Sequence, residues 1–210
     1  MSSFEDFTQN IYNNLQKPLP GLMAHLQMAP AERAEMMKYP DSGKDAREAA
    51  VMILFHPVND QPHLIFIVRQ SYDGVHSGQI SFPGGKREPE DPDLIQTAIR
   101  ETAEEIGINS KIIRVLGTTS PLFIPPSNFM VTPVVGYCPT IDNFTPQESE
   151  VKEVLTIPFT HFTDGRYKKV HTVNASYKRN MMVPCYRIQE HIIWGATAMM
   201  LNELVEIIKN

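Results

Sequence analysis

A short glycine loop followed by an acidic amphipathic helix most restricts how this 210-residue chain can fold. The loop is the segment Ser81-Phe82-Pro83-Gly84-Gly85-Lys86. Its paired glycines let the backbone bend sharply and approach a ligand closely. The helix is predicted over about Pro92–Ile106, because proline fits a first helical turn and Gly107 suits the left-handed residue just past the end. A strand, a glycine loop and a helix are therefore expected in succession.

The two sides of this helix differ in character. At about 100° per residue, one half is apolar and packs on a core, while Glu101, Glu104 and Glu105 fall together on the other side. Alone, such a cluster is most often a solvated helix face. The glycine loop before it changes the interpretation, because the carboxylates can then be held against a metal-bound phosphate. Adjacent carboxylates repel one another, and oxygen-only ligands suit Mg²⁺ or Mn²⁺. We predict a metal site there.

The rest of the chain alternates short strands with flanking helices. This pattern predicts an α/β (α+β) fold in which a mixed sheet is covered on both faces. Residues 1–45 are expected to form a helical arm packed on the domain, and residues 46–210 the domain itself, as one unit. Residues 151–157 are ambiguous. Helices are predicted at Phe4–Leu15, Pro30–Met37 and Trp194–Ile208, and strands at Ala49–His56, His63–Arg69, Gln79–Phe82, Ile112–Thr119, Phe129–Tyr137, Tyr167–Val173 and Met182–Ile188.

The loop and helix resemble the signature of the Nudix hydrolase family. That signature has a Gly, then a Glu, then Arg-Glu-apolar-x-Glu-Glu-x-Gly-apolar, and this chain has Gly85 followed by Arg100-Glu101-Thr102-Ala103-Glu104-Glu105-Ile106-Gly107-Ile108. The resemblance implies a Nudix-type α/β/α sandwich that hydrolyses a diphosphate with Mg²⁺ or Mn²⁺. It implies that Glu101 and Glu105 bind metal, that Glu104 shares a second ion or acts as base, and that Arg100 and Gly107 are structural.

The chain departs from the family signature in two places. Thr102 occupies a usually apolar position, and the signature is one residue longer than usual, with Asp91 where a Glu is expected. We do not count Asp91 as a metal ligand. The longer signature, preceded by Phe-Pro-Gly-Gly, resembles the coenzyme A diphosphatase subgroup, and the resemblance continues at Leu19–Pro30, His76–Gly85, Asn128–Gly136 and Ile193–Thr197. Gly74 replaces a second upstream Arg of that subgroup.

The resemblance implies hydrolysis of coenzyme A or acyl-coenzyme A to (acyl) 4′-phosphopantetheine and adenosine 3′,5′-bisphosphate. Gly84, Gly85, Lys86 and Arg69 are the expected substrate-binding residues, and Lys86, Arg87 or Arg69 can substitute for the absent Arg. Glu150 is a candidate for the general base, with a solvated turn as an equal interpretation, whereas a solvated position is favoured for Glu153.

Other functions stay open at this point. Pro125-Pro126 lies where ADP-sugar-type members carry a diagnostic proline, so hydrolysis of ADP-ribose or another nucleoside-diphosphate derivative is the main alternative. A non-enzymatic Nudix-fold binding module is disfavoured because all three signature carboxylates are present. An isomerase of isoprenoid diphosphates is disfavoured because no Cys lies near the signature.

Composition restricts the partners. With 19 basic and 24 acidic residues, the net charge of −5 argues against broad nucleic-acid binding. No apolar run approaches the roughly 20 residues of a membrane span, and the N-terminus lacks the features of a signal peptide, so we expect a cytoplasmic protein without a membrane partner. We do not expect Cys138 and Cys185 to form a disulfide. The Phe4–Leu15 helix can pack on its own domain or on a second subunit, which leaves a homodimer open.

Overall fold

The computed structural model describes residues 3–37, 43, 45–70, 78–175 and 178–209. Within these residues, eight strands form one mixed sheet around β1 (Arg47–Val58), which pairs antiparallel with β2 (Gln61–Arg69) and β4 (Gly84–Lys86) and parallel with β7 (Phe129–Tyr137). The other four strands extend it, since β3 (Ile80–Ser81) and β8 (Val151–Pro158) pair with β2, and β5 (Arg114–Thr118) and β6 (Leu122–Ile124) pair with β7.

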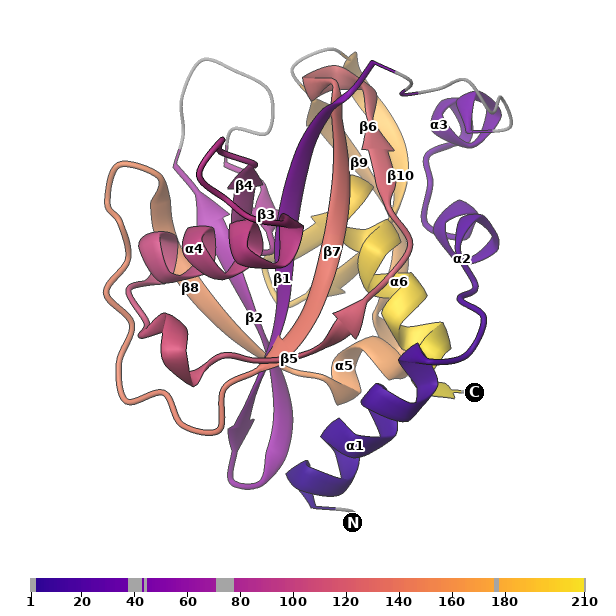
Figure 1. Ribbon diagram of the computed structural model, residues 1–210. Helices are drawn as coiled ribbons and strands as arrows, with labels where there is room; N and C mark the ends of the chain where they lie inside the picture. Colours follow the sequence, from indigo (N-terminus) through magenta and orange to yellow (C-terminus); the bar gives the residue numbers. More distant parts are fainter. Residues whose placement is uncertain (1–2, 38–42, 44, 71–77, 176–177, 210) are drawn as a thin grey trace.

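Helices cover both faces of this sheet (Figure 1). Successive residues of a strand point to opposite faces, and β1 follows that rule: Ala50, Met52 and Leu54 share a core cluster with Ala98 and Ile106 of α4 (Leu94–Ile106). Residues between them in β1 belong to a second cluster, with α1 (Phe4–Leu15) and α6 (Gly195–Lys209). The predicted α/β/α sandwich with a central mixed sheet is thus confirmed.

A separate antiparallel sheet joins β9 (Lys168–Ala175), β10 (Lys178–Ile188) and β11 (His191–Trp194). The sequence prediction missed β11, and it began the last helix at Trp194 instead of Gly195. The ambiguous residues 151–157 belong to β8, which is in register with β2. Short helical turns complete the fold at α5 (Thr160–Thr163), Ser110–Ile112, Pro125–Ser127 and Gly165–Tyr167.

Several predicted boundaries shift for local reasons. The acidic helix begins at Leu94 instead of Pro92, because the side chain of Asp93 caps it by accepting a hydrogen bond from the Gln96 amide at 2.8 Å. Its end at Gly107, with φ 70°, is as predicted. The β1–β2 hairpin turns at Asn59 and Asp60, both left-handed, as a two-residue turn of this kind requires.

The N-terminal arm consists of α1, α2 (Leu22–Leu26), which was not predicted, and α3 (Ala31–Met36). A buried carboxylate, Glu203 of α6, fastens it to the domain by accepting hydrogen bonds from the Gly21 amide at 2.9 Å, from the His25 ring at 3.0 Å and from the Ser120 amide at 3.1 Å. The division of the chain at residue 45 stays a prediction. None of the helices in the described part of the chain is long and apolar enough to cross a membrane. Both cysteines are buried free thiols.

The Glu203 contacts predict how the arm depends on pH. Burial opposes the charge of Glu203, but the hydrogen bonds from His25 and Ser120 outweigh it and hold its pKa below the usual value. This stabilisation is therefore present above the unfolded pKa of about 4.3 and is lost as pH falls through the lower folded pKa. We expect Glu203→Ala to reduce the free energy of unfolding by about 3 kcal/mol at pH 7, and by less in acid, as measured by urea denaturation.

Glu206→Ala is the matched control on the same helix. Glu206 is a partly exposed side chain paired with Lys209 at 3.1 Å, so its removal is expected to cost less than about 1 kcal/mol. Equal losses in the two variants would contradict the assigned role of Glu203.

Candidate active site

The two loop glycines lie against the carboxylates of α4. The amide of Gly84 donates a hydrogen bond to Oε2 of Glu105 at 2.7 Å. A Cβ atom on Gly84, with φ 148°, would lie 2.3 Å from the carbonyl oxygen of Ala50, and a Cβ on Gly85 would lie 2.6 Å from the carboxylate carbon of Glu101. No side chain fits at Gly84, because the collision is with backbone, and a side chain at Gly85 would displace the Glu101 carboxylate, so both glycines are needed for the observed contact of loop and carboxylates.

Glu105 is an acid almost removed from solvent, with a side chain only 2% exposed. Burial raises its pKa to about 8, although the Gly84 amide and Arg69, whose Nη1 is 3.9 Å from Oε1, act in the opposite direction. Burial also raises the pKa of Glu101, and Arg100 opposes this shift. Both carboxylates therefore lie where a further positive charge would stabilise their ionised forms.

Glu150, which immediately precedes β8, faces the same region. Its negative charge contributes to the raised pKa of both Glu101 and Glu105. Glu104 is different: its side chain is 53% exposed, and its Oε2 accepts a hydrogen bond from Nη1 of Arg100 at 3.1 Å. The structure thus places Glu101 and Glu105 at the loop, with Glu150 acting on both only electrostatically, and bonds Glu104 to Arg100. The neighbouring acid Glu153 is an exposed residue of β8, in register with Val68.

Arg100 connects the first acid of the lengthened signature to Glu101. Its Nε and Nη2 donate to the two carboxylate oxygens of Asp91 at 3.0 and 2.9 Å, and its Nη1 donates to Oε1 of Glu101 at 3.0 Å. Asp91 is buried and also accepts from the Thr97 hydroxyl and the Glu88 amide. The hydrogen bond from Arg100 holds the pKa of Asp91 well below its usual range. Asp91 therefore positions Arg100, a role that the sequence analysis missed.

The second departure, Thr102, also has a local explanation. This residue is fully buried, and its hydroxyl donates to the carbonyl of Ala98 one turn earlier at 2.6 Å. Because the polar group is satisfied within the helix, a threonine can occupy a position that faces the core.

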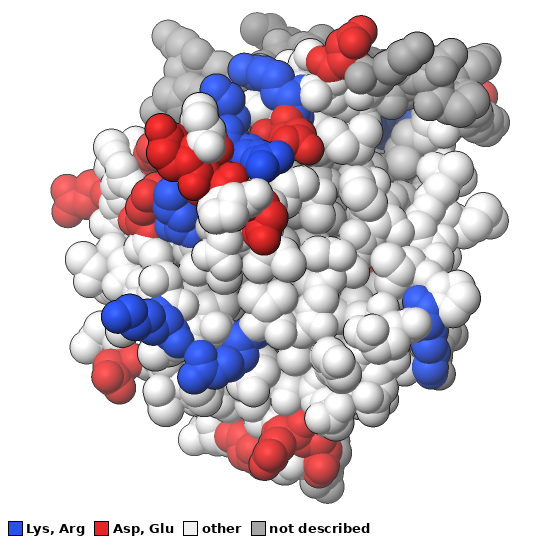
Figure 2. Space-filling model, viewed as in Figure 1, with Lys and Arg blue, Asp and Glu red and all other residues white. Residues whose placement is uncertain are grey.

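The expected substrate-binding cations lie around this site. Lys86 is exposed at the end of β4, whereas Arg87 donates to Glu48 at 2.7 Å and to the Pro92 carbonyl at 3.1 Å. The Nε of Arg69 is buried with no hydrogen-bond partner among the described residues. Residues 71–77, which include the Gly74 position, lie outside the described residues. Figure 2 shows acidic and basic side chains gathered over α4 and the adjoining end of the sheet.

The residues present can form part of a metal site. No three acidic, histidine or cysteine side chains converge closely enough in the described part of the chain to enclose a cation by themselves. Mg²⁺, however, usually takes one or two carboxylates and completes its shell with water and substrate phosphates. Glu101 and Glu105 provide two such carboxylates, both with raised pKa values, beside a Gly85 that leaves room for a ligand. This donor set fits a divalent cation.

Comparison with known proteins identifies the family. The model of the NUDIX domain matches residues 46–180. The chain belongs to the Nudix hydrolase family. It is 35% identical over 161 residues to the uncharacterized Nudix hydrolase NudL of Pectobacterium atrosepticum, covering 75% of this chain and 81% of the relative. NudL of Yersinia enterocolitica is 34% identical over 165 residues, covering 77% and 82%. The MutT protein of Methanosarcina mazei Go1 superposes with a TM-score of 0.48 at 13% identity, over 76% of this chain and 92% of that protein.

Nudix membership confirms the first part of the sequence interpretation. It implies pyrophosphohydrolase activity on a small nucleoside-diphosphate derivative, and Nudix proteins generally use divalent metals. The two NudL relatives are uncharacterized hydrolases, so their similarity to this chain does not indicate a substrate.

The close contact at Gly85 predicts a loss of activity. We expect Gly85→Ala to lower kcat/KM by about 100-fold, because the added methyl group displaces Glu101 from the loop and small displacements at a reacting centre have effects of this size. This fall in kcat/KM is measured by steady-state kinetics with any diphosphate substrate that the wild-type enzyme cleaves. Gly165→Ala is the control, since a Cβ there meets nothing within 4 Å. Unchanged activity in Gly85→Ala would contradict the proposed proximity of loop and carboxylate.

Asp91 can be tested separately from the candidate ligands. Asp91→Asn keeps the size of the side chain but removes the charge that Arg100 pairs with, so we expect a loss of about 1–2 kcal/mol in unfolding free energy and roughly tenfold in kcat. Asp93→Asn is the matched control, because asparagine caps a helix as well as aspartate does. If both variants behave alike in denaturation and kinetics, Asp91 does not position Glu101 through Arg100.

Proposed function

We propose that this Nudix hydrolase cleaves the diphosphate of coenzyme A or acyl-coenzyme A with Mg²⁺ or Mn²⁺. The products are (acyl) 4′-phosphopantetheine and adenosine 3′,5′-bisphosphate. The observation that carries the diphosphate chemistry is the placement of Glu101 and Glu105 against the backbone of Gly84 and Gly85. The narrower substrate is supported by the lengthened signature and by the resemblance to coenzyme A diphosphatases over most of the chain.

In this proposal Glu101 and Glu105 hold the cation. When bound, a divalent cation neutralises the diphosphate and lowers the pKa of a coordinated water. Gly84 and Gly85 let the phosphates approach the backbone, and Arg100 fixes the direction of Glu101. Water attacks one phosphorus in line, the bridging P–O bond breaks, and the other phosphate leaves with the bond electrons.

The proton of the attacking water goes to a glutamate, and we assign that role to Glu150 in preference to Glu104. Glu150 interacts electrostatically with both Glu101 and Glu105. Glu104 also interacts with Glu101, but its carboxylate is 53% exposed and is bonded to Arg100. Lys86 and Arg69 are the cations that we assign to the phosphates of the substrate. Arg87 is less suitable because Glu48 and the Pro92 carbonyl already hold its guanidinium.

The second candidate substrate is ADP-ribose or another nucleoside-diphosphate derivative without a 3′-phosphate. Two features favour it: Gly74 replaces the upstream Arg of the coenzyme A subgroup, and Pro125-Pro126 begins the helical turn that follows β6. Coenzyme A and ADP-ribose differ by the 3′-phosphate, which needs its own cation, and by the group beyond the diphosphate, which is pantetheine in one and ribose in the other, so an assay can separate them.

Product identification decides between them. Purified protein is incubated with coenzyme A, acetyl-coenzyme A or ADP-ribose and with Mg²⁺ or Mn²⁺, and the products are identified by mass spectrometry. We expect 4′-phosphopantetheine and adenosine 3′,5′-bisphosphate from coenzyme A, at a kcat/KM at least tenfold above that for ADP-ribose. Rapid cleavage of ADP-ribose with coenzyme A left intact would reverse the assignment.

Substitutions test the roles of the glutamates. A general base contributes about 10²–10⁴-fold to rate, so we expect Glu150→Gln to lower kcat by at least 100-fold with a small change in KM, and Glu105→Gln to abolish metal-dependent turnover. Glu153→Gln, an exposed acid on the same strand segment, is the control and should keep normal kinetics. A large loss in Glu104→Gln together with normal turnover in Glu150→Gln would assign the base to Glu104.

A further inference from the structure

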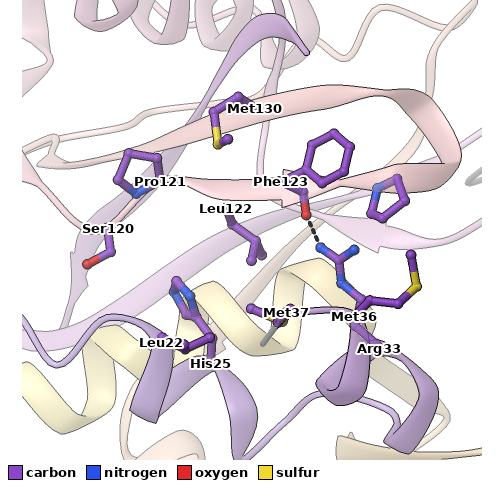
Figure 3. A pocket seen from close by; sticks show the side chains of 11 residues that line it. Leu22, His25, Arg33, Met36, Met37, Ser120, Pro121, Leu122, Phe123 and Met130 are labelled. Carbon is purple, nitrogen blue, oxygen red and sulfur yellow. Dashed lines mark hydrogen bonds between the residues drawn. The ribbon is translucent and has the colours of Figure 1, made fainter. Parts of the chain in front are cut away.

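A pocket lies where the N-terminal arm meets the edge strand β6 (Figure 3). Its volume is about 230 Å³, less than the 300–1,000 Å³ of pockets that enclose a whole drug-sized ligand. It therefore fits one end of a ligand. Most of the wall is apolar and comes from the arm and from β6 and β7, chiefly Leu22, Met36, Met37, Leu122, Phe123 and Met130.

The two nitrogen-bearing side chains at this pocket, His25 and Arg33, are already engaged. His25 is bonded to Glu203, and Arg33 donates to the carbonyl of Phe123. No carboxylate is among the lining side chains in the described part of the chain. The lining therefore suits an uncharged, apolar group, and its methionines can adapt to chains of different shape.

The sheet connects this pocket to the glycine loop. Lys86 of β4 is in register with Ala49 of β1, Ala49 with Val131 of β7, and Val131 with Leu122 of β6. These four residues form one row across the sheet. Ala49, Val131 and Leu122 are buried in the core cluster that includes α6, so the row measures the straight separation of the two places. Strands in a sheet are spaced about 4.8 Å apart, so three steps separate Lys86 from the pocket wall by roughly 14 Å.

We propose that this pocket binds the acyl end of an acyl-coenzyme A. The inference rests on the proposed function and deepens it, because it places the part of the substrate opposite the nucleotide. The pantetheine arm has about thirteen bonds between phosphorus and sulfur, or about four peptide-like units, which extend over roughly 14 Å. With the diphosphate at Gly84 and Gly85, a fully extended arm matches this straight separation, and the proposal requires the acyl chain to pass the edge of the sheet at β6 to enter the pocket.

The surface between the glycine loop and the pocket is compatible with a bound pantetheine arm. In Figure 2 the charged side chains cluster on the α4 side, and the surface directly beside that cluster, below the grey atoms, is mostly uncharged. At the mouth of the pocket, Leu22 is 44% exposed and Met36 is 48% exposed. A bound acyl chain removes these apolar surfaces from water, which favours binding of an acylated substrate over free coenzyme A.

Two variants test the pocket against a matched control. Met36→Glu places a charge in the wall, and Met130→Trp fills the space from the opposite side. Met23→Glu adds the same charge at a residue of α2 that is 72% exposed and does not line the pocket. Values of kcat/KM are measured for coenzyme A, acetyl-, hexanoyl- and decanoyl-coenzyme A, with the thermal midpoint of each variant as a check on folding.

We expect the wild type to prefer hexanoyl-coenzyme A over coenzyme A. Met36→Glu and Met130→Trp should lower kcat/KM for hexanoyl-coenzyme A by about tenfold, mainly through KM, while coenzyme A is cleaved at the wild-type rate. Met23→Glu should leave the whole series unchanged.

The outcomes separate the two proposals. A wild type that cleaves neither coenzyme A nor its thioesters, but cleaves ADP-ribose, overturns the proposed function. A wild type that cleaves all thioesters equally, with no effect of either pocket variant, overturns the acyl site alone. A change of oligomeric state in Met36→Glu and Met23→Glu, with the chain-length preference retained, overturns it too and makes this face an interface between two copies of the chain.

Discussion

Glu105 of α4 is a carboxylic acid buried against the sheet. Burial disfavours its charged form, and the surrounding contacts only partly compensate for this. Its partners are one backbone amide at 2.7 Å and a guanidinium nitrogen at 3.9 Å. Together they do not offset burial, since the pKa remains near 8. The amide belongs to Gly84, which must be a glycine because any side chain would collide with β1. The buried carboxylate of Glu105 thus accounts for the hydrogen bond that ties the loop to α4 and for the demand for a cation, while β1 requires the glycine at position 84.

Glu101 is positioned differently, through a series of ion pairs that starts at Asp91. Asp91 is buried and fully bonded, it orients Arg100, and Arg100 bonds Glu101. This series of ion pairs is present in the longer signature, because an aspartate in the turn before α4 reaches the guanidinium of Arg100. A residue can therefore be added between loop and helix without moving the carboxylate that faces the loop.

The local parts of this arrangement were predictable from sequence. The glycine pair, the helix and the hairpin at Asn59-Asp60 each depend on residues close together in the chain. The direction of Glu104, the role of Asp91 and the proximity of Glu150 were not predictable in this way. Arg100 bonds Asp91, Glu101 and Glu104 at once, and its reach to Asp91 depends on the fold of the turn before α4. Glu150 approaches Glu105 only because β8 pairs with β2. The helix α2 and the strands β4, β6 and β11 were missed because each has only three to five residues, too few to show a clear period.

Hydrogen bonds contribute to holding the N-terminal arm on the domain beside the pocket. A cavity removes the apolar packing that would otherwise hold α2 and α3 against β6. Apolar packing of Met28 and Ala29 in the core is supplemented there by directional bonds: Glu203 binds Gly21, His25 and Ser120, and the Asn202 amide donates to the Ala24 carbonyl at 2.8 Å. Such bonds fix the arm while leaving the pocket volume unfilled. In the proposed acyl site the arm therefore shapes substrate preference without taking part in the chemistry, and the chemistry at α4 can remain unchanged while the arm varies.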